Sequence, residues 1–296
     1  MENILTLIGP AGHPDALQLD RIATAIKDVA GNPHDPVWLD EGHAADLPFT
    51  GLTLARVESI ARSFVKNAPV DVIVQPSADR KKHVLVADMD ATMVVGETLD
   101  ELAALAGVGE RVSAITARAM NGDIDFATAL RERVALLAGH PTSLLEQVIP
   151  KMKLTPGARA LVSTMKANGA RTVLVSGGFK FFTSIVAKTC GFDEERANDL
   201  EVSEGKLTGR VIEPIKGRVA KREALMAAAT RRRVPLDRTL AVGDGANDTE
   251  MLLTAGLGIA FHAKPIVAAQ ARARIDHNDL TALLYAQGYK KEEFVV

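Results

Sequence analysis

Three short turns carry the residues whose types and spacing suit chemistry. One is Asp88-Met89-Asp90-Ala91-Thr92, and another is Gly243-Asp244-Gly245-Ala246-Asn247-Asp248. Carboxylates this close repel one another unless a divalent cation or a shared proton compensates, and Mg²⁺ prefers carboxylate and water oxygens. The third turn, Ser176-Gly177-Gly178, offers a hydroxyl and free N–H groups before an expected helix, a combination that binds anions. An anion site beside a metal site indicates phosphate chemistry.

Each turn also has an ordinary explanation, because Asp, Ser and Gly are common in loops and helix caps. Their positions favour the chemical reading. The turns directly follow short apolar runs at residues 84–87, 172–175 and 239–242. Such runs are typical of strands buried on both faces of a parallel sheet, and ligands bind beyond the carboxyl ends of those strands.

The elements around these runs predict an α/β fold. Helical patterns at 158–168, 179–190 and 219–231 alternate with the strands, which predicts a doubly wound, Rossmann-like parallel sheet. Residues 97–150 are mostly helical and far too long for an ordinary strand-to-helix loop, so we expect an inserted helical cap above the strand ends. Residues 199–214 predict a β-hairpin.

The first 78 residues predict a separate small α/β unit. Strand patterns occur at 4–8, 36–39 and 70–74, and helical patterns at 15–30 and 52–66. A polar, charged stretch follows at 76–82. We therefore expect an N-terminal domain at 1–78 and a second domain at 79–296.

The motifs, in this order, resemble those of the haloacid dehalogenase superfamily of phosphatases. Residues 88–92 resemble its DxDxT signature, 175–178 its second motif, Lys221 its basic third motif and 243–248 its fourth. Within that superfamily, residues 93–102 and 125–134 resemble the substrate-reading cap of the phosphoserine phosphatases. The likeness covers about 80–296, and residues 1–78 resemble the ACT-like domain that precedes the catalytic domain in longer members.

This resemblance implies roles for the catalytic residues. Asp88 would attack phosphorus and form an aspartyl-phosphate, and Asp90 would act as general acid and then general base. Ser176, the N–H of Gly177 and the ammonium of Lys221 would hold the phosphoryl oxygens. The implied reaction is hydrolysis of O-phospho-L-serine to L-serine and phosphate, the last step of serine biosynthesis.

The resemblance also implies a magnesium cofactor. Its ligands would be Asp88, Asp244 and the backbone carbonyl of Asp90, with Asp248 supporting the site from nearby. The cation would offset the repulsion between a carboxylate nucleophile and an anionic phosphate.

Phosphoserine also carries an ammonium and a carboxylate group. The resemblance points to Glu97 for the ammonium, Arg133 for the carboxylate and Asn247 as a further substrate-binding residue. Met120 and Phe126 are candidates to cover the ligand. The cap would open for substrate and close to exclude water, with Gly96 and residues 150–157 as hinges.

Several alternatives stay open at this point. Charged helix residues usually face solvent, which is the ordinary reading of Lys221, Glu97 and Arg133. A phosphatase or phosphotransferase for another small phosphomonoester, such as phosphohomoserine, fits the same motifs, as does a serine-responsive regulator that no longer turns over. Ala91 replaces the usual Ser of the signature, which bears on substrate preference. His140 and His262 have no predicted role.

Composition limits the class of protein. The 296 residues are 47% hydrophobic and 24% charged, and 35 Lys and Arg against 37 Asp and Glu give a net charge of −2. We expect no sequence-independent nucleic-acid binding, because that needs clustered cations. The single cysteine, Cys190, and the lack of a signal peptide or an apolar span predict a cytoplasmic protein without membrane attachment. The expected partner is a small-molecule substrate, and a homodimer is left open.

Overall fold

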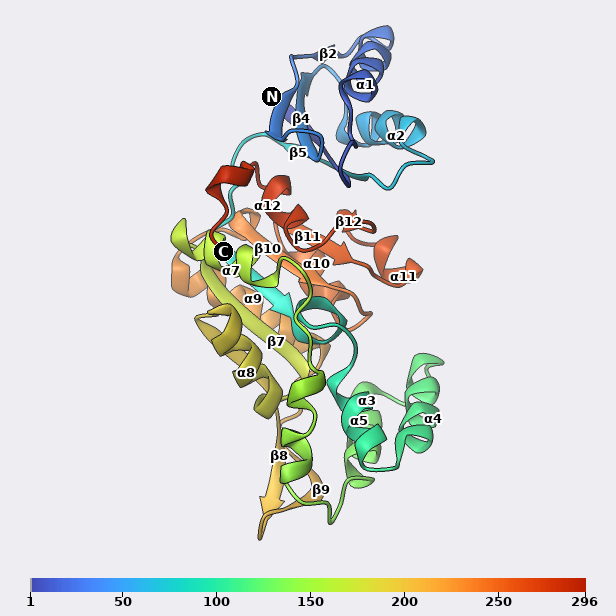
Figure 1. Ribbon diagram of the computed structural model, residues 1–296, viewed down its shortest axis with the longest axis vertical. Helices are drawn as coiled ribbons and strands as arrows, with labels where there is room; N and C mark the ends of the chain where they lie inside the picture. The colour runs from blue at the N-terminus through green and yellow to red at the C-terminus, as the bar shows by residue number, and fades with distance from the viewer. Residues whose placement is uncertain (1) are drawn as a thin grey trace.

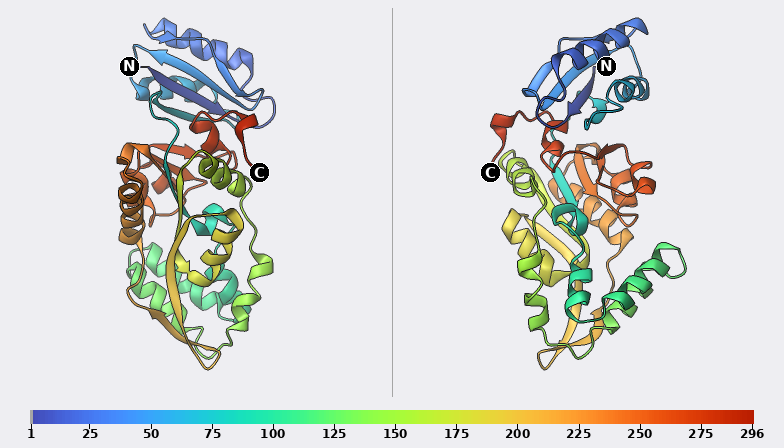
Figure 2. Two further views of the ribbon diagram at one scale, coloured as in Figure 1. Left: turned by 90° about the vertical axis from the view of Figure 1, so that its left-hand side faces the viewer. Right: turned by 45° about the vertical axis from the view of Figure 1, so that its right-hand side comes forward.

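A computed structural model describes residues 2–296. A small β-sheet with two helices lies at one end of the molecule, a larger sheet covered by helices lies in the middle, and a group of short helices lies towards the other end (Figure 1). Both chain ends lie on the side of the small sheet rather than on the side of the short helices (Figure 2).

The central sheet positions the predicted motifs. Its strand order is β12-β11-β10-β6-β7-β8-β9, and all neighbours are parallel except the β8–β9 pair. The strands are β6 (Val84–Asp88), β7 (Arg171–Phe179), β8 (Glu194–Ser203), β9 (Lys206–Ile212), β10 (Thr239–Gly243), β11 (Leu257–Phe261) and β12 (Ala273–Ile275). Because β6 lies between β7 and β10, the carboxyl ends of the three motif-bearing strands meet at one edge. The doubly wound fold predicted from the sequence is confirmed.

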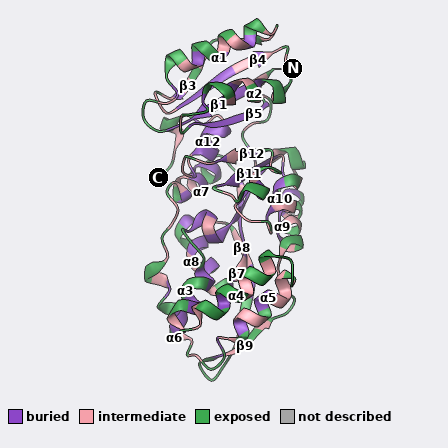
Figure 3. Cartoon of the chain, turned by 90° about the vertical axis from the view of Figure 1, so that its right-hand side faces the viewer, coloured by how far each residue is buried: buried purple, intermediate pink, exposed green. Residues whose placement is uncertain are grey.

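Helices cover both faces of this sheet. Side chains alternate across a strand, so Val84 and Val86 of β6 pack on one face while Leu85 and Ala87 pack on the other. The first face is covered by α9 (Arg218–Arg232), α10 (Thr249–Thr254) and α11 (Pro265–Ala268), and the second by α7 (Ala158–Ala167), α8 (Lys180–Cys190) and α12 (Ala282–Ala286). Strands β6 and β10, in the middle of the sheet, are consequently buried along their length (Figure 3).

The inserted cap follows β6. Its helices are α3 (Thr98–Leu105), α4 (Gly109–Met120), α5 (Phe126–Ala135) and α6 (Ser143–Glu146), with short turns η1 (Met89–Met93) before them and η2 (Ile149–Lys151) after them. Apolar cap residues such as Leu102, Leu130 and Val134 belong to the same buried cluster as the second face of the sheet. The cap is therefore packed onto the sheet domain.

The small sheet is antiparallel, with the order β2-β4-β1-β5 and β3 paired to β4. Its elements are β1 (Asn3–Ile8), α1 (Ala16–Asp28), β2 (Asn32–Pro33), β3 (Val37–Asp40), β4 (Ala44–Thr50), α2 (Leu54–Phe64) and β5 (Asp71–Pro76). Helix α1 starts at a capping box, in which Asp15 and Gln18 each accept from the other's backbone N–H. Its apolar face, with Leu19 and Ile22, packs in a cluster of the small sheet's own residues.

Several details differ from the sequence prediction, which also did not identify strands β11 and β12. Strand β4 was missed, because Asp46 and Pro48 interrupt its apolar pattern. The predicted hairpin is present, since residues 199–203 of β8 pair with β9, but β8 itself begins earlier, at Glu194, and its first half is the parallel neighbour of β7. Strand β7 extends through Gly177 and Gly178, and α8 starts only at Lys180, so the predicted helix start at this turn is wrong.

The remaining features concern the chain as a whole. Two further short turns are η3 (Leu236–Arg238) and η4 (Lys291–Glu293). Cys190 is buried and unpaired. Within residues 2–296, no helix combines the length and the apolar character needed to cross a bilayer.

Candidate active site

A buried lysine joins two of the predicted motifs at the edge of the central sheet. Nζ of Lys221, on α9, lies 2.6 Å from Oδ1 of Asp88 at the end of β6 and 2.7 Å from Oδ1 of Asp248 after β10. Lys221 is only 1% exposed, so the ordinary reading as a solvated helix lysine is wrong. A buried ammonium needs such anionic partners, because removal from water is costly.

The backbone around Asp88 is bent to present these side chains. After β6 the chain enters the η1 turn, where Ala91 has a φ of +52° and its N–H donates to Gly96 O. Asp88 caps this turn by accepting from the N–H of Met89 through Oδ1. Both partners of Asp88 therefore use Oδ1, and within the described chain Oδ2 is left without a hydrogen-bond partner.

The carboxylates of Asp88, Asp244 and Asp248 form a cluster that suits a metal ion. Each offers one oxygen, and these three oxygens lie within 4.8 Å of one another. Octahedral Mg²⁺ holds oxygens at about 2.1 Å, so neighbouring ligand oxygens lie about 3 to 4.2 Å apart. Oxygens within 4.8 Å of one another are close enough for one ion to bring together, and an all-oxygen donor set of this charge fits Mg²⁺.

Asp90 points into a separate set of contacts. Its Oδ1 accepts from the N–H and the hydroxyl of Thr98 at 2.8 and 2.7 Å, and Oδ2 accepts from the hydroxyl of Ser176 at 3.1 Å. The Asp90 carboxylate is thus not part of the three-carboxylate cluster. That the backbone carbonyl of Asp90 binds Mg²⁺ remains a prediction. Thr98 was missed by the sequence analysis, because a threonine at the start of a helix carries no functional signal of its own.

Burial and crowding shift the titration of these groups. Burial, and then the charge of Asp248, raise the pKa of Asp88, against the opposing effect of Lys221. Burial also raises the pKa of Asp90, although its hydrogen bonds oppose the rise. For Asp244, burial and Asp248 raise the pKa to about 6. Burial alone would lower the pKa of Lys221, but Asp248 and Asp88 together raise it.

The predicted phosphate cradle lies at the end of β7. The Ser176 hydroxyl accepts from the N–H of Gly178 at 2.8 Å, and Gly177 O accepts from the side chain of Asn198. The ring of Phe126, the first residue of α5, leaves no room for side chains here: a Cβ at Gly177 would lie 2.8 Å from it, and one at Gly217 would lie 3.0 Å from it. A cap residue therefore lies directly against the cradle.

The predicted substrate-reading residues are less tightly connected. Glu97 precedes α3 and retains solvent access, yet its partial enclosure raises its pKa to about 7, with Asp90 and Asp244 adding to the rise and Arg133 opposing it. Burial lowers the pKa of Arg133, on α5, and Glu97 opposes that shift. Glu97 and Arg133 therefore act electrostatically on one another. The Asn247 side chain covers Gly245 and makes no hydrogen bond to the other predicted site residues within the described chain.

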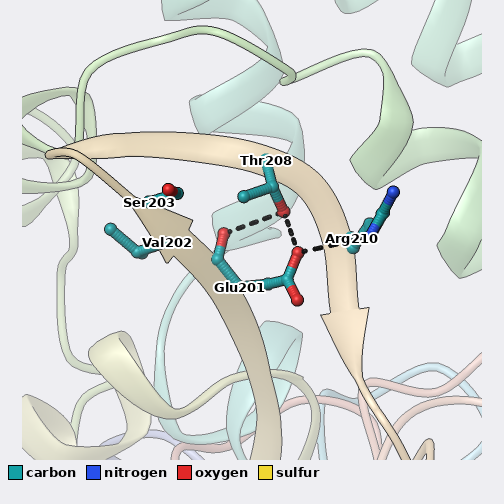
Figure 4. Close-up of a pocket in the computed structure, with 5 residues that line it drawn as sticks. All are labelled: Glu201, Val202, Ser203, Thr208 and Arg210. Atoms are coloured by element: carbon teal, nitrogen blue, oxygen red, sulfur yellow. Dashed lines mark hydrogen bonds and ion pairs between the residues drawn. The ribbon is translucent and has the colours of Figure 1, made fainter.

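A surface hollow, away from the predicted site residues in the sequence, lies on the β8–β9 hairpin (Figure 4). The Thr208 hydroxyl donates to the Glu201 carboxylate at 2.7 Å and contacts Glu201 O at 3.2 Å, while Arg210 lies 3.9 Å from the same carboxylate. These polar groups satisfy one another, so the hollow offers little to a ligand.

Comparison with known proteins agrees with this geometry. Residues 85–253 match the family model described as haloacid dehalogenase-like hydrolase. The chain belongs to this family. The matched residues of this haloacid dehalogenase-like hydrolase span from β6 to α10 and so include all four motifs.

Relatives extend the comparison beyond the family model. The chain is 42% identical over 260 residues to phosphoserine phosphatase SerB2 of Mycobacterium tuberculosis, covering 84% of this chain and 64% of the relative, and so spans somewhat less than two thirds of that protein. It is 43% identical over 203 residues to the phosphoserine phosphatase of Lactococcus lactis, covering 69% of this chain and 94% of that relative. A crystal structure of a probable phosphoserine phosphatase from Vibrio cholerae, in unliganded form, superposes with a TM-score of 0.80 at 30% identity, covering 99% of this chain and 88% of the other.

Proposed function

We propose that this chain hydrolyses O-phospho-L-serine to L-serine and phosphate through an aspartyl-phosphate, the last step of serine biosynthesis. The observation that carries the proposal is the buried Lys221 that holds the carboxylates of Asp88 and Asp248 beside Asp244. The relatives named above as phosphoserine phosphatases support this substrate, since one of them is matched over 94% of its length.

In the first step, Oδ2 of Asp88 attacks phosphorus and the bond from phosphorus to the serine oxygen breaks. Asp90 gives its proton to that departing oxygen. Its position supports this role, because Thr98 and Ser176 hold its carboxyl group apart from the three-carboxylate cluster. Lys221, Ser176 and the N–H of Gly177 then stabilise negative charge on the phosphoryl oxygens.

In the second step, water loses a proton to Asp90 and attacks phosphorus. The bond to Asp88 breaks, which regenerates the Asp88 carboxylate and the protonated Asp90 and releases phosphate. Asp88 and Asp244, with Asp248 beside them, would hold Mg²⁺, which would supply the positive charge that offsets repulsion between nucleophile and phosphate. The Phe126 ring against Gly177 supports the exclusion of bulk water during this step.

Glu97 and Arg133 are proposed to bind the ammonium and carboxylate of the substrate, and Asn247 to assist. The opposite charges of Glu97 and Arg133, each of which affects the pKa of the other, fit a zwitterionic amino acid. A planar guanidinium suits a carboxylate because it can donate two parallel hydrogen bonds.

The test is phosphate release in the presence of Mg²⁺ and in EDTA. The panel comprises phosphoserine, phosphohomoserine, phosphoethanolamine, which lacks the carboxylate, and phospho-3-hydroxypropionate, which lacks the ammonium. We expect the highest kcat/KM for phosphoserine and a loss of at least about tenfold for each analogue that leaves a charged site group unpaired. Preference for phosphohomoserine would favour the alternative small-phosphomonoester function, and no release from any member would favour a regulatory protein.

Arg133 gives a sharper version of this test. We expect Arg133→Met to reduce kcat/KM for phosphoserine while leaving phosphoethanolamine unaffected, because only phosphoserine carries the carboxylate. Arg131→Met is the matched control, since Arg131 lies on the same helix but is exposed and pairs with Glu213. Equal losses for both substrates would count against the assignment.

We also propose that residues 1–78 form an ACT-like domain with a regulatory or dimerising role, that 79–296 form the phosphatase domain, and that the protein works in the cytoplasm. The separate apolar cluster of the small sheet supports this division. The regulatory and dimerising roles are tested by light scattering and by phosphate release, each measured with and without L-serine. A monomer whose mass and activity do not change with L-serine would contradict both roles.

A further inference from the structure

One lysine of the central-sheet domain contacts a helix of the cap. Lys264 lies in the loop after β11, immediately before α11, and is exposed. Its Nζ lies 3.8 Å from Sδ of Met120, the last residue of α4. One end of α4 points towards α11 in both views that show the two helices (Figures 1 and 2).

The surroundings of the Lys264 ammonium are electrically favourable. Helix α4 has 12 residues, and its final carbonyls carry partial negative charge that a nearby cation stabilises. A thioether sulfur is a weak acceptor, so the Met120 contact adds to this attraction. Within residues 2–296, Lys264 makes no ion pair with a carboxylate. Its charge also acts on Asp244, where it opposes the larger effect of burial on the pKa.

We propose that Lys264 is a positioning residue that holds the end of α4 over the site and thereby favours the closed cap. The inference rests on the proposed function only in taking the three-carboxylate cluster and the Ser176–Gly178 turn as the substrate site. The attraction of Lys264 for the end of α4 exists without any ligand, and it is lost when the cap swings away from the sheet.

The loop that carries Lys264 is itself fixed. His262, two residues earlier, has a left-handed φ of +44°, and its N–H donates to Ile275 O at 2.8 Å. Its Nε2–H donates to Asn278 O at 2.8 Å, and Asn278 in turn donates through Nδ2 to Asp71 of the small sheet at 2.7 Å. The backbone next to Lys264 is therefore fixed by contacts that lead to the small sheet. The Lys264 side chain spans the distance from this backbone to Met120.

The experiment compares Lys264→Met, Lys264→Arg and a matched control, Lys188→Met, whose lysine is exposed on α8. Loss of a single charge at a helix end corresponds to about a two- to fivefold effect. If only the closed cap binds tightly, this appears as a rise in the KM for phosphoserine with kcat retained, because saturating substrate closes the cap. Arg at position 264 restores the wild-type KM, and the control changes nothing.

Hydrogen exchange of the backbone amides at 117–123, measured without substrate, is the second readout. We expect faster exchange there in Lys264→Met than in wild type, and wild-type exchange in Lys264→Arg. Unchanged exchange, or a fall in kcat with an unchanged KM, would overturn the proposal, and the latter would indicate direct contact with the transferring phosphate. This measurement needs no turnover, so it decides the role of Lys264 even if phosphoserine is not hydrolysed.

Discussion

Buried aspartates serve two regions of this molecule in opposite ways. At the site, Asp88 and Asp248 share the single cation of Lys221, with Asp244 close by. At the junction between the small and central sheets, by contrast, Asp71 accepts from the backbone N–H groups of residues 276–278 and from the amide of Asn278. One region crowds negative charge, and the other surrounds it with donors.

A second junction aspartate follows the same rule as Asp71. Asp46 accepts from both terminal nitrogens of Arg80, at 2.6 and 3.0 Å, and from the hydroxyl of Thr6 at 2.7 Å. Arg80 also donates to the carbonyls of Tyr285 and Ala286, so the pair fastens the small sheet to the C-terminal segment.

The difference teaches which buried charge does chemistry. A carboxylate whose oxygens are all satisfied lowers the energy of the folded state and has nothing left to offer a ligand. A carboxylate that shares a cation with its neighbours is held at a cost, and a metal ion or a phosphoryl group relieves that cost. We therefore expect neutralisation to remove activity in the first region and stability in the second.

Asp88→Asn gives the largest expected change. Without the nucleophile, kcat should fall by at least about 10⁴-fold. The melting temperature should stay the same or rise, because one of several crowded negative charges is gone. Phosphate release and thermal denaturation measure the two effects. Substantial turnover, or a marked drop in melting temperature, would contradict the contrast between the two regions.

Lys221→Met removes the cation instead of a carboxylate. We expect kcat to fall about 10²- to 10³-fold and the free energy of unfolding to fall by about 3–5 kcal/mol, since two buried carboxylates lose their partner. Added Mg²⁺ should recover part of that stability by binding the carboxylates. Lys188→Met is the control in urea denaturation. A variant as stable as wild type without Mg²⁺ would show that the carboxylates are not held at a cost.

Asp71→Ala tests the other region. Its removal leaves buried N–H groups unpaired, which should lower the free energy of unfolding by about 3 kcal/mol. Because the reacting groups are untouched, kcat at 25 °C should stay within about twofold of wild type, while KM should shift in the same direction as in Lys264→Met. The exposed Asp20 provides the control, as Asp20→Ala in urea denaturation. A large loss of kcat with unchanged stability would reverse the assignment.

The same contrast explains what could be predicted from the sequence. Strands β6, β7 and β10 could be predicted because a run of apolar residues is visible in the local sequence alone. The polar turns at their ends located the site. Strand β4 was not, because its buried Asp46 is tolerated only through Arg80, and nothing local signals that pairing. Strand β8, between β7 and the edge strand β9, has a polar sequence because only part of it is buried.

Site residues divide along similar lines. Asp88, Asp244 and Ser176 lie at or next to the carboxyl ends of strands and so could be placed from the sequence. The burial of Lys221 depends on carboxylates from two other elements, so composition alone indicated a solvated lysine. Thr98, His262 and Lys264 act through contacts with distant segments, and none belongs to a motif whose spacing distinguishes it from a surface residue.

Glu97 belongs neither to the crowded carboxylates of the site nor to the fully hydrogen-bonded ones of the junction, and its substitution gives the smallest expected effect of these variants. Its pKa of about 7, raised first by burial and then by Asp90, means that the carboxylate binds an ammonium group fully only above that pH. At pH 8.5 we expect Glu97→Gln to lower kcat/KM for phosphoserine about tenfold, the size of one hydrogen bond between charged groups. As the pH falls through 7, wild-type Glu97 becomes neutral like Gln, so at pH 5.5 the two proteins should differ by less than about twofold. Phospho-3-hydroxypropionate, which has no ammonium, serves as the control and should show no such convergence. If the ratio of kcat/KM between wild type and Glu97→Gln stays constant between pH 5.5 and 8.5, Glu97 is ionised throughout that range. It would then resemble the fully hydrogen-bonded carboxylates of the junction.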